Sequence, residues 1–202
     1  MKQSIKNSVY VDEESMIFLN NYSDRELIDY LQNDENADKS AAFSVLYSRH
    51  SVAVYNYCHR VFGDGYFADD IFQETFIKFI RVIQNKSEID NVRGYLLRSA
   101  RNLSINFKRN NSHEFVELDE EQFYQIDNNF EEKELTKLIN SALELLPNEH
   151  KEAFLLQNTN GMSYQEISNV TEVPISTVRN RIVRAKSKLR EILSPILDYK
   201  EK

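Results

Sequence analysis

Apolar side chains in the segment 174–193 recur every three or four residues, the spacing that places them on one face of an α-helix. These residues are Ile175, Val178, Ile182, Ala185, Leu189 and Ile192. The pattern predicts one continuous buried stripe along a long helix. With four glycines and three prolines among 202 residues, the whole chain favours helices over turn-rich β architectures. We therefore expect an all-α fold.

Hydrophobic spacing, capping motifs and helix-stopping residues predict seven further helices. They lie at about 23–31, 39–62, 66–84, 91–109, 131–145, 148–158 and 163–170. Ser23 with Glu26, and Ser163 with Glu166, have the spacing of a capping box, which satisfies free N–H groups at a helix start. Gly-Asp-Gly at 63–65 and Asn-Gly at 160–161 are helix-stop signals. Pro174 is expected in the first turn of the last helix, where its missing N–H costs little.

The formal charge of −7 is unevenly distributed along the chain. The balances are −5 in residues 1–40, +4 in 41–109, −8 in 110–134 and +2 in 135–202. The acidic stretch 110–134 has no sustained helical period. It is predicted to be a linker between two small helical bundles, and a charged surface loop within one domain is the alternative. The domains are expected at 23–109 and 135–194, with tails at 1–22 and 195–202.

Composition excludes several classes of site. The four glycines form neither a dinucleotide fingerprint nor a phosphate-binding loop, and the single Cys58 excludes an internal disulfide and a cysteine-rich zinc site. Cys58, His59 and His50 lie on one predicted apolar helix without an acidic ligand beside them, so core packing is expected and no metal, cofactor or catalytic residue. No leader and no run of 18 apolar residues is present, which favours a cytoplasmic protein without membrane insertion.

The C-terminal pattern predicts a helix-turn-helix. A short capped helix is followed by a tight connection at 171–173 and a longer helix with six basic and no acidic side chains between Ile175 and Arg190. The second helix of such a motif fits the major groove of DNA. An ordinary helical hairpin with a solvated basic face is the alternative, and the spacing of the turn favours DNA. The residues opposite the apolar stripe are Ser176, Arg179, Asn180, Val183, Arg184 and Ser187.

Two other helices carry polar faces. On the predicted helix 66–84, Asp69, Asp70, Gln73 and Glu74 lie opposite a broad apolar face. Acidic groups near a helix N-terminus also complement the macrodipole, so this pattern alone is a weak indication of a docking surface.

On the predicted helix 91–109, the face opposite the apolar residues contains Arg98, Arg101, Ile105, Lys108 and Arg109. Such a face suits a phosphate backbone, and a merely solvated cationic face is the alternative.

The residues that carry a family resemblance are Ala-Asp-Asp-Ile-Phe-Gln-Glu-Thr-Phe at 68–76, Arg-Gly-Tyr-Leu at 93–96 and Ala-Arg-Asn at 100–102. They resemble domain two of the extracytoplasmic-function (ECF) sigma factors of bacterial RNA polymerase. Leu-Pro at 146–147, Tyr-Gln-Glu-Ile at 164–167, Thr-Val-Arg-Asn-Arg at 177–181, Arg-Ala at 184–185 and Leu-Arg at 189–190 resemble their domain four. The resemblance covers about residues 24–193.

The resemblance implies a non-enzymatic factor that binds core polymerase and directs it to promoters. It implies that Asp69, Asp70, Gln73 and Glu74 dock on the clamp helices of the β′ subunit, that domain four meets the β flap, and that an anti-sigma factor regulates the protein. The minus-ten element would be held by the loop 85–90 and its helix, through Lys86, Tyr95, Arg98, Arg101, Asn102 and Lys108. The minus-thirty-five element would be read by Ser176, Thr177, Arg179, Asn180, Arg181 and Arg184. The acidic linker would follow the basic path of nucleic acid through the polymerase.

Tyr95 occupies a position where the family usually has Trp. Asn180 and Val183 are not the residues expected for every subgroup, so the promoter sequence recognised by other members cannot be assigned to this chain. An autonomous helix-turn-helix regulator, which would bind DNA tightly without polymerase, is the alternative function. A nucleic-acid enzyme is the second alternative, and it would need a cluster of carboxylates or histidines. Asp69 with Asp70 has no matching partner elsewhere in the sequence.

Overall fold

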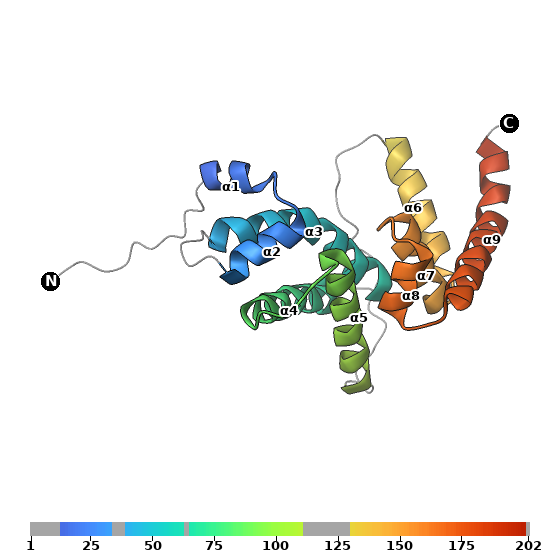
Figure 1. Cartoon of the computed structure of the whole chain (residues 1–202). Helices are drawn as coiled ribbons and strands as arrows, with labels where there is room; N and C mark the ends of the chain where they lie inside the picture. The colour runs from blue at the N-terminus through green and yellow to red at the C-terminus, as the bar shows by residue number, and fades with distance from the viewer. Residues whose placement is uncertain (1–12, 34–38, 63–64, 111–129, 201–202) are drawn as a thin grey trace.

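The computed structural model describes residues 13–33, 39–62, 65–110 and 130–200, and these residues form helices and short connections without a strand (Figure 1). An N-terminal bundle, α1 to α5, occupies one side of the molecule, and a C-terminal bundle, α6 to α9, occupies the other. The N-terminal helices are α1 (Glu13–Leu19), α2 (Asp24–Asn33), α3 (Lys39–Phe62), α4 (Gly65–Gln84) and α5 (Val92–Asn110). The C-terminal helices are α6 (Phe130–Glu144), α7 (Asn148–Asn158), α8 (Tyr164–Thr171) and α9 (Ile175–Lys200).

Helix α3 is the centre of the N-terminal bundle, because α1, α2, α4 and α5 all pack against it. Its apolar residues face several directions, as a helix surrounded by others requires. Its fully buried side chains, all with less than 2% of their surface exposed, include Leu46, Val54, Tyr57 and Cys58. Phe79 of α4 and Leu96 of α5 complete this core.

The predicted stripe of the last helix is largely confirmed. Val178, Ile182, Ala185 and Leu189 of α9 are buried against α6, α7 and α8. Ile175 is an exception, with 39% of its surface exposed, because it lies at the first residue of the helix, beyond the end of the packed face. Pro174 precedes α9, and its carbonyl accepts the first helical hydrogen bonds, from the N–H groups of Thr177 and Val178.

Both predicted capping boxes form. The Ser23 N–H donates to the Glu26 carboxylate at 2.7 Å, and the Glu26 N–H donates to the Ser23 hydroxyl at 3.3 Å. The same reciprocal pair joins Ser163 and Glu166 at the start of α8, at 2.8 and 3.3 Å. These carboxylates accept donors that the first turn of a helix otherwise leaves free, which fixes where α2 and α8 begin.

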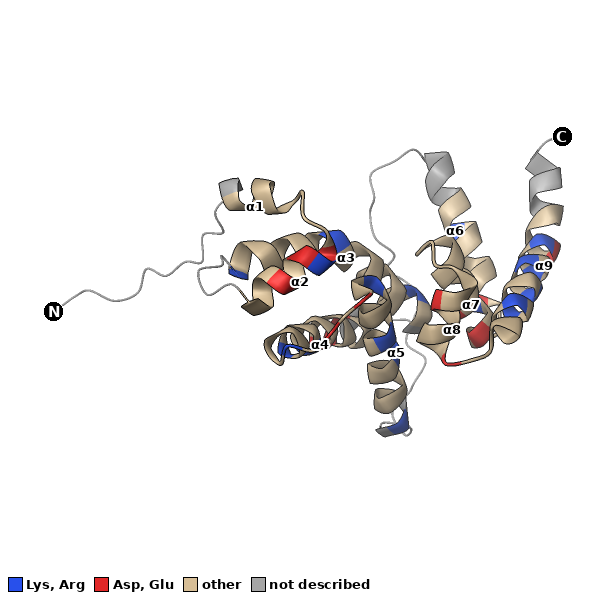
Figure 2. Ribbon diagram, viewed as in Figure 1, with Lys and Arg blue, Asp and Glu red and all other residues tan. Residues whose placement is uncertain are grey.

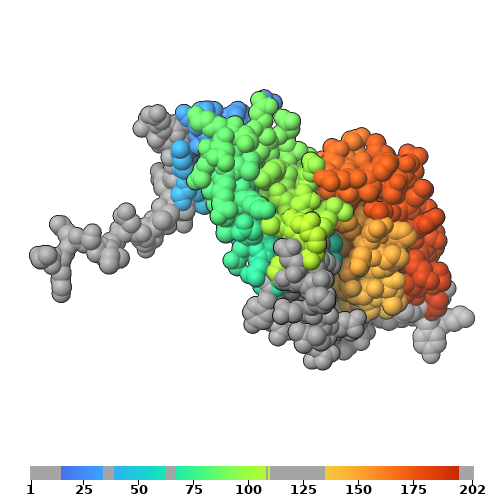
Figure 3. Space-filling view, turned by 90° about the horizontal axis from the view of Figure 1, so that it is seen from below, coloured from blue at the N-terminus to red at the C-terminus, as the bar shows by residue number. Residues whose placement is uncertain are grey.

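The two bundles pack directly on each other. Helix α5 contacts α8, and α3 contacts α7. One cluster of buried residues runs through both bundles, from Val54 and Tyr57 of α3 to Ala153 and Leu156 of α7 and Ile167 of α8. Seen from below, α5 lies beside the C-terminal bundle (Figure 3). The sequence predicted two bundles but not this contact between them.

Several element boundaries differ from the expected ones. The range 1–22, expected to be a tail, contains helix α1, and Leu19 at its end is buried with 2% exposed surface. Helix α6 begins at Phe130, inside the range expected to be linker, and α9 continues to Lys200. Phe107, near the end of α5, has an apolar side chain that the periodicity of this helix predicts to face the core, but it is 38% exposed and stacks on Phe67 with ring centroids 4.1 Å apart. The stop signal at residues 63–64 and the linker residues 111–129 lie outside the described residues.

Among the described residues, no helix is both long and apolar enough to cross a membrane.

Asp24 links α2 to α3, and its replacement by Asn should destabilise the fold. Its carboxylate lies 2.6 Å from His50 Nε2 and 2.8 Å from Arg49 Nη1. The hydrogen bond from His50, with a smaller contribution from Arg49, lowers the pKa of Asp24 against the opposing effect of burial. We expect Asp24→Asn to lower the free energy of unfolding by about 1–2 kcal/mol at pH 7 in urea titrations, since a hydrogen bond to a charged group contributes about that much.

The pH dependence of this loss has a definite sign. Because the folded-state pKa is lowered, the stabilisation is complete above the unfolded-state value of about 3.9 and is lost as the pH falls through the folded-state value. The difference between wild type and Asp24→Asn should therefore be present at pH 5 and shrink below pH 4. Asp29→Asn, a substitution at an exposed site of the same helix, should leave the free energy of unfolding unchanged both at pH 5 and below pH 4. A difference independent of pH would contradict the assignment.

Gly161 sets the turn between α7 and α8 through a backbone conformation that a side chain resists. Its φ is +63°, and a Cβ added there would meet nothing within 4 Å. Since the cost of a substitution is then backbone strain alone, Gly161→Ala should lower the free energy of unfolding by about 1–2 kcal/mol. Gly161→Asn should cost less, because Asn enters the left-handed region more easily. Equal losses for the two variants in urea titrations would contradict this account.

Candidate nucleic-acid and polymerase interfaces

Helices α8 and α9 form the predicted helix-turn-helix. The connection begins at Glu172, whose φ of 58° and ψ of 36° turn the chain out of α8. The Ser168 hydroxyl then donates to the carbonyl of Val173 at 2.6 Å and holds the turn closed. Helix α9 packs through its apolar stripe on α6, α7 and α8, which leaves its opposite face to solvent. Basic positions follow one another along this helix (Figure 2).

The structure places most of the candidate minus-thirty-five residues on that solvent face. Ser176, Arg179, Asn180 and Arg184 are exposed, and Thr177 is half-buried. Arg181 differs from these, because its side chain is only 14% exposed and forms an ion pair with Glu149 of α7. Arg179, Asn180 and Arg184 are therefore exposed members of the candidate set, whereas Arg181 is committed to a contact within the protein.

The candidate polymerase-binding residues lie on the first half of α4, on the side opposite its apolar face. Asp70 and Gln73 are exposed. Asp69 is half-exposed and accepts a hydrogen bond from His59 Nε2 of α3 at 3.0 Å, and the carboxylate of Glu74 lies 3.9 Å from Arg81, about two turns further along. The four residues share one side of the helix, and Asp70 and Gln73 form its most accessible part.

Two cations of α5 are paired with carboxylates of the C-terminal bundle. Arg98 Nη2 lies 2.8 Å from the carboxylate of Glu172, and both of these side chains remain about half exposed. Arg101 Nε lies 3.0 Å from the carboxylate of Glu152 in α7, and the two side chains are 19% and 10% exposed. No local pattern indicated these partners, because they are 74 and 51 residues away along the chain. Asn102 and Arg109 remain exposed.

The remaining candidate minus-ten residues surround the loop between α4 and α5. Lys86 is exposed and adopts a φ of 54° directly after α4. The side-chain amide of Gln32 in α2 donates to the carbonyl of Ser87 at 3.1 Å, which ties the loop to the bundle. Tyr95 is half-buried, with its ring centroid 5.9 Å from that of Phe79. The side chain of Lys108 lies outside the described residues.

The two histidines of α3 have acidic neighbours, contrary to the sequence-based expectation. His50 pairs with Asp24 of α2, and His59 pairs with Asp69 of α4. Both carboxylates belong to other helices, so the sequence of α3 alone did not indicate them. Within the described ranges, no three His, Cys, Asp or Glu side chains gather in a group that could hold a metal ion. Cys58 is buried, and this burial raises the pKa of its thiol to about 12.

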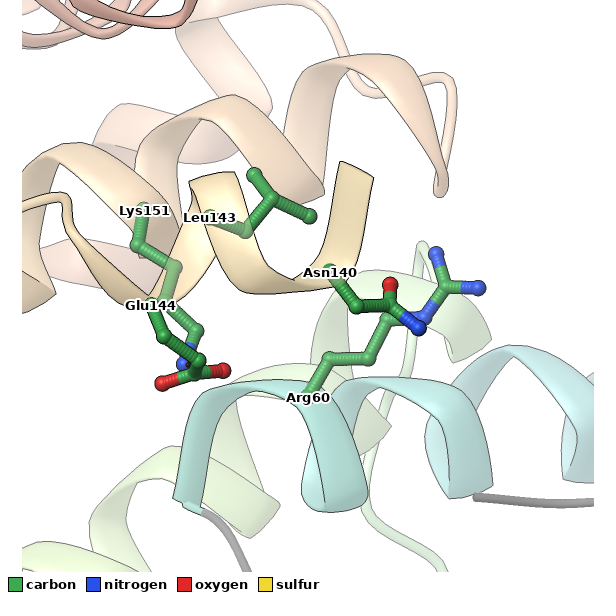
Figure 4. A pocket seen from close by; sticks show the side chains of 5 residues that line it. All are labelled: Arg60, Asn140, Leu143, Glu144 and Lys151. Atoms are coloured by element: carbon green, nitrogen blue, oxygen red, sulfur yellow. Dashed lines mark hydrogen bonds and ion pairs between the residues drawn. The ribbon is translucent and has the colours of Figure 1, made fainter. Parts of the chain in front are cut away.

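A shallow hollow lies where α3, α6 and α7 meet. It is lined by Arg60, Asn140, Leu143, Glu144 and Lys151. In Figure 4 the Lys151 ammonium reaches the Glu144 carboxylate, and Lys151 Nζ lies 2.6 Å from Glu144 Oε1. Typical small-molecule sites are well-formed cavities with convergent polar groups that are not already paired. This hollow therefore does not indicate a cofactor site.

Family models match both bundles. The model described as sigma-70 region 2 matches residues 46–114, and the model described as sigma-70, region 4, matches residues 136–189. Together they cover the α4 and α5 surfaces and the helix-turn-helix, in the order that the sequence predicted.

Individual relatives agree with the family models. The chain is 31% identical to the ECF RNA polymerase sigma factor SigE of Mycolicibacterium smegmatis over 170 residues, which is 80% of this chain and 66% of SigE. It is 25% identical to the RNA polymerase sigma-H factor of Pseudomonas aeruginosa over 188 residues, 86% of this chain and 95% of that factor.

A solved structure shares the fold. It is that of CnrH in complex with the cytosolic domain of CnrY, with a TM-score of 0.60 and 25% identity over 85% of this chain and 97% of that one. The order of the two matched regions, the relatives and the shared fold agree. The chain belongs to the ECF subfamily of the sigma-70 factors, the subunits that direct RNA polymerase in transcription initiation.

Proposed function

We propose that this chain docks on the polymerase β′ clamp helices through Asp69, Asp70, Gln73 and Glu74. The exposure of Asp70 and Gln73 on the outer side of α4 supports this assignment. The apolar residues of α4, including Phe76 and Phe79, are committed to the core, so the polar side is the part of the helix available to a partner. The N-terminal bundle, residues 23–109 together with α1, would form this docking domain.

We propose that the α4–α5 loop and α5 hold the separated minus-ten strand. Lys86 and Asn102 are accessible to a strand, and the aromatic ring of Tyr95 offers a stacking surface for a base. Arg98 and Arg101 would contact phosphates once their carboxylate partners move away, and Lys108 would extend the same row along α5.

We propose that α9 reads the minus-thirty-five element from the major groove. The observation that carries this proposal is the exposure of Arg179, Asn180 and Arg184 on one face of a helix whose other face is buried. Arginine and asparagine make two-pronged contacts to guanine and adenine edges. The residues 135–194 would form this second domain and also meet the β flap, with 110–134 as the linker.

We further propose that the protein works in the cytoplasm as a non-enzymatic subunit and is restrained by an anti-sigma factor. The structure of the similar protein CnrH in complex with the cytosolic domain of CnrY supports a protein partner for this chain. Run-off transcription with purified core polymerase tests the whole assignment. It should yield defined start sites whose upstream sequences share two elements, and no start site above the background of core alone would overturn it.

The docking surface can be tested by Asp70→Arg with Gln73→Ala. Both side chains are exposed, so the double variant should melt within about 2 °C of the wild type. Reversing a charge at the centre of an interface should weaken binding to core polymerase at least about tenfold, measured by co-purification and titration. Asp29→Arg, the same charge reversal at an exposed site of α2, is the matched control. Unchanged core binding by the folded double variant would contradict the assignment.

Mutations can distinguish base recognition by α9 from contacts to the phosphate backbone. Arg179→Ala and Arg184→Ala should relax sequence preference within the minus-thirty-five element, because a base contact contributes about 1–3 kcal/mol of discrimination. Arg190→Ala, at an exposed site further along the helix, should lower activity on all sequences alike and reduce the salt slope by about one. Transcription from a promoter library randomised in that element measures each profile. A reshaped profile for Arg190→Ala beside unchanged profiles for the other two variants would show that α9 is oriented differently.

A further inference from the structure

Val183 is an apolar side chain on the solvent face of α9, and 57% of its surface is exposed. By contrast, Val178, Ile182, Ala185 and Leu189 are buried on the opposite face of the same helix. A single exposed apolar residue is ordinary on a protein surface, so exposure alone assigns Val183 no role. Its position among the candidate DNA-contacting residues carries the argument.

Val183 belongs to a narrow row of uncharged side chains along α9. The helix turns by about 100° per residue, so the members of the row lie within about 60° of one another around its axis. They are Ser176, Asn180, Val183 and Ser187, and each is exposed. The centre of the row lies about 200° from the centre of the buried stripe, so the row points almost directly away from the protein.

Cations flank this row on both sides. Arg179 and Arg184 are exposed, and each lies about 70° from the centre of the row, on opposite sides of it. Their long side chains can reach phosphates at the walls of the major groove or guanine edges beside the row. Either contact holds the uncharged row over the floor of the groove, where the base edges lie.

The protein fixes the direction of the row before DNA binds. Arg181 of α9 forms an ion pair with Glu149 of α7, and the Ser168 hydroxyl closes the preceding turn on the carbonyl of Val173. A valine in a helix has one strongly preferred rotamer, so the methyl groups of Val183 already point in a defined direction. A contact through them therefore loses little side-chain entropy.

The bases differ in what they offer to a side chain without polar atoms. In the major groove, guanine, adenine and cytosine present hydrogen-bonding groups, whereas thymine also presents its C5-methyl group. Methyl groups that cover a hydrogen-bonding group leave it without a partner, and this costs free energy. Thymine is therefore the base whose edge matches the side chain of Val183.

We propose that Val183 is a specificity-determining residue, which selects a thymine in the minus-thirty-five element through the C5-methyl group of that base. The thymine lies one base-pair step from the base that Asn180 contacts, because three residues of helix rise about 4.5 Å and one base pair rises about 3.4 Å. The inference rests on the proposed function, since it takes α9 to lie in the major groove, and it adds the identity of a base that this face recognises.

Deoxyuridine tests the methyl group alone, because uracil keeps the hydrogen-bonding groups of thymine and lacks its C5-methyl group. The probe is a promoter duplex with the minus-thirty-five element of a start site found by run-off transcription, in which the thymines are replaced one at a time. Each duplex competes with the unmodified one for holoenzyme assembled from core polymerase and the full-length chain. We expect one position at which the replacement weakens binding about fourfold, the fold-change that corresponds to about 0.8 kcal/mol for one buried methyl group.

Variants assign the effect to this side chain. Val183→Ala should reduce the loss at the sensitive position to less than about 1.5-fold, because the contacting methyl groups are gone. The variant keeps the fold, since the site is exposed and alanine favours helices. Val183→Ile, which keeps a branched apolar side chain, should retain the loss. Leu145→Ala is the matched control, because it truncates an apolar side chain that is 66% exposed between α6 and α7 and should leave the fourfold loss in place.

A duplex with 5-methylcytosine separates the methyl group from the identity of the base pair. Cytosine at the sensitive position should weaken binding by the wild-type holoenzyme, and 5-methylcytosine should recover part of that loss. With Val183→Ala, the cytosine and 5-methylcytosine duplexes should bind equally.

Equal binding of the thymine and uracil duplexes at every position would overturn the proposal. A methyl effect that Val183→Ala leaves unchanged, or an element without thymine on either strand, would overturn it as well. Failure of the proposed function is recognised separately, as absence of run-off start sites with the wild type and core polymerase. Defined start sites without a methyl effect contradict only the role of Val183.

Discussion

The packing of both halves of the molecule depends on α3. Its apolar residues are not confined to one stripe, so it must be covered on several sides, and α7 of the other bundle provides part of that cover. Burial of a large apolar side chain contributes about 1.5–3 kcal/mol, whereas an exposed ion pair contributes about 0–1 kcal/mol. Apolar packing therefore supplies most of the free energy that joins the bundles. The charged contacts at the rim determine which faces meet.

Local patterns in the sequence were sufficient to predict most elements. The stripe of α9 and the two capping boxes depend on residues three or four positions apart, and such spacing is visible in a single sequence. Helix α1 was missed because its residues carry little pattern of their own, and its packing depends on contact with α3, which is distant in the sequence. The partners of Arg98 and Arg101 could not be predicted, since charge on a helix face does not reveal what a segment 50 or more residues away will place against it.

The distribution of charge explains how an acidic protein can carry basic surfaces. The formal charge is −7, yet the cationic residues concentrate on α5 and α9. On α5 and at Arg181 the described structure pairs these cations with carboxylates from other helices. Each pair must be broken before the cation can neutralise a phosphate, so the net gain from a DNA contact is smaller than the contact alone would give. The competing carboxylates therefore weaken binding to DNA of arbitrary sequence more than they weaken binding to a sequence that also offers base contacts.

The two proposed DNA-binding faces differ in accessibility, and the difference follows the order in which a promoter offers its elements. The face of α9 with Arg179, Asn180 and Arg184 is exposed, and its proposed target is duplex DNA, which is present before initiation. On α5, Arg98 and Arg101 are paired with carboxylates, and the proposed target of this face is a separated strand, which exists only after the duplex opens. If these roles hold, the carboxylates on Arg98 and Arg101 block no productive contact before the duplex opens, because a separated strand is not yet present.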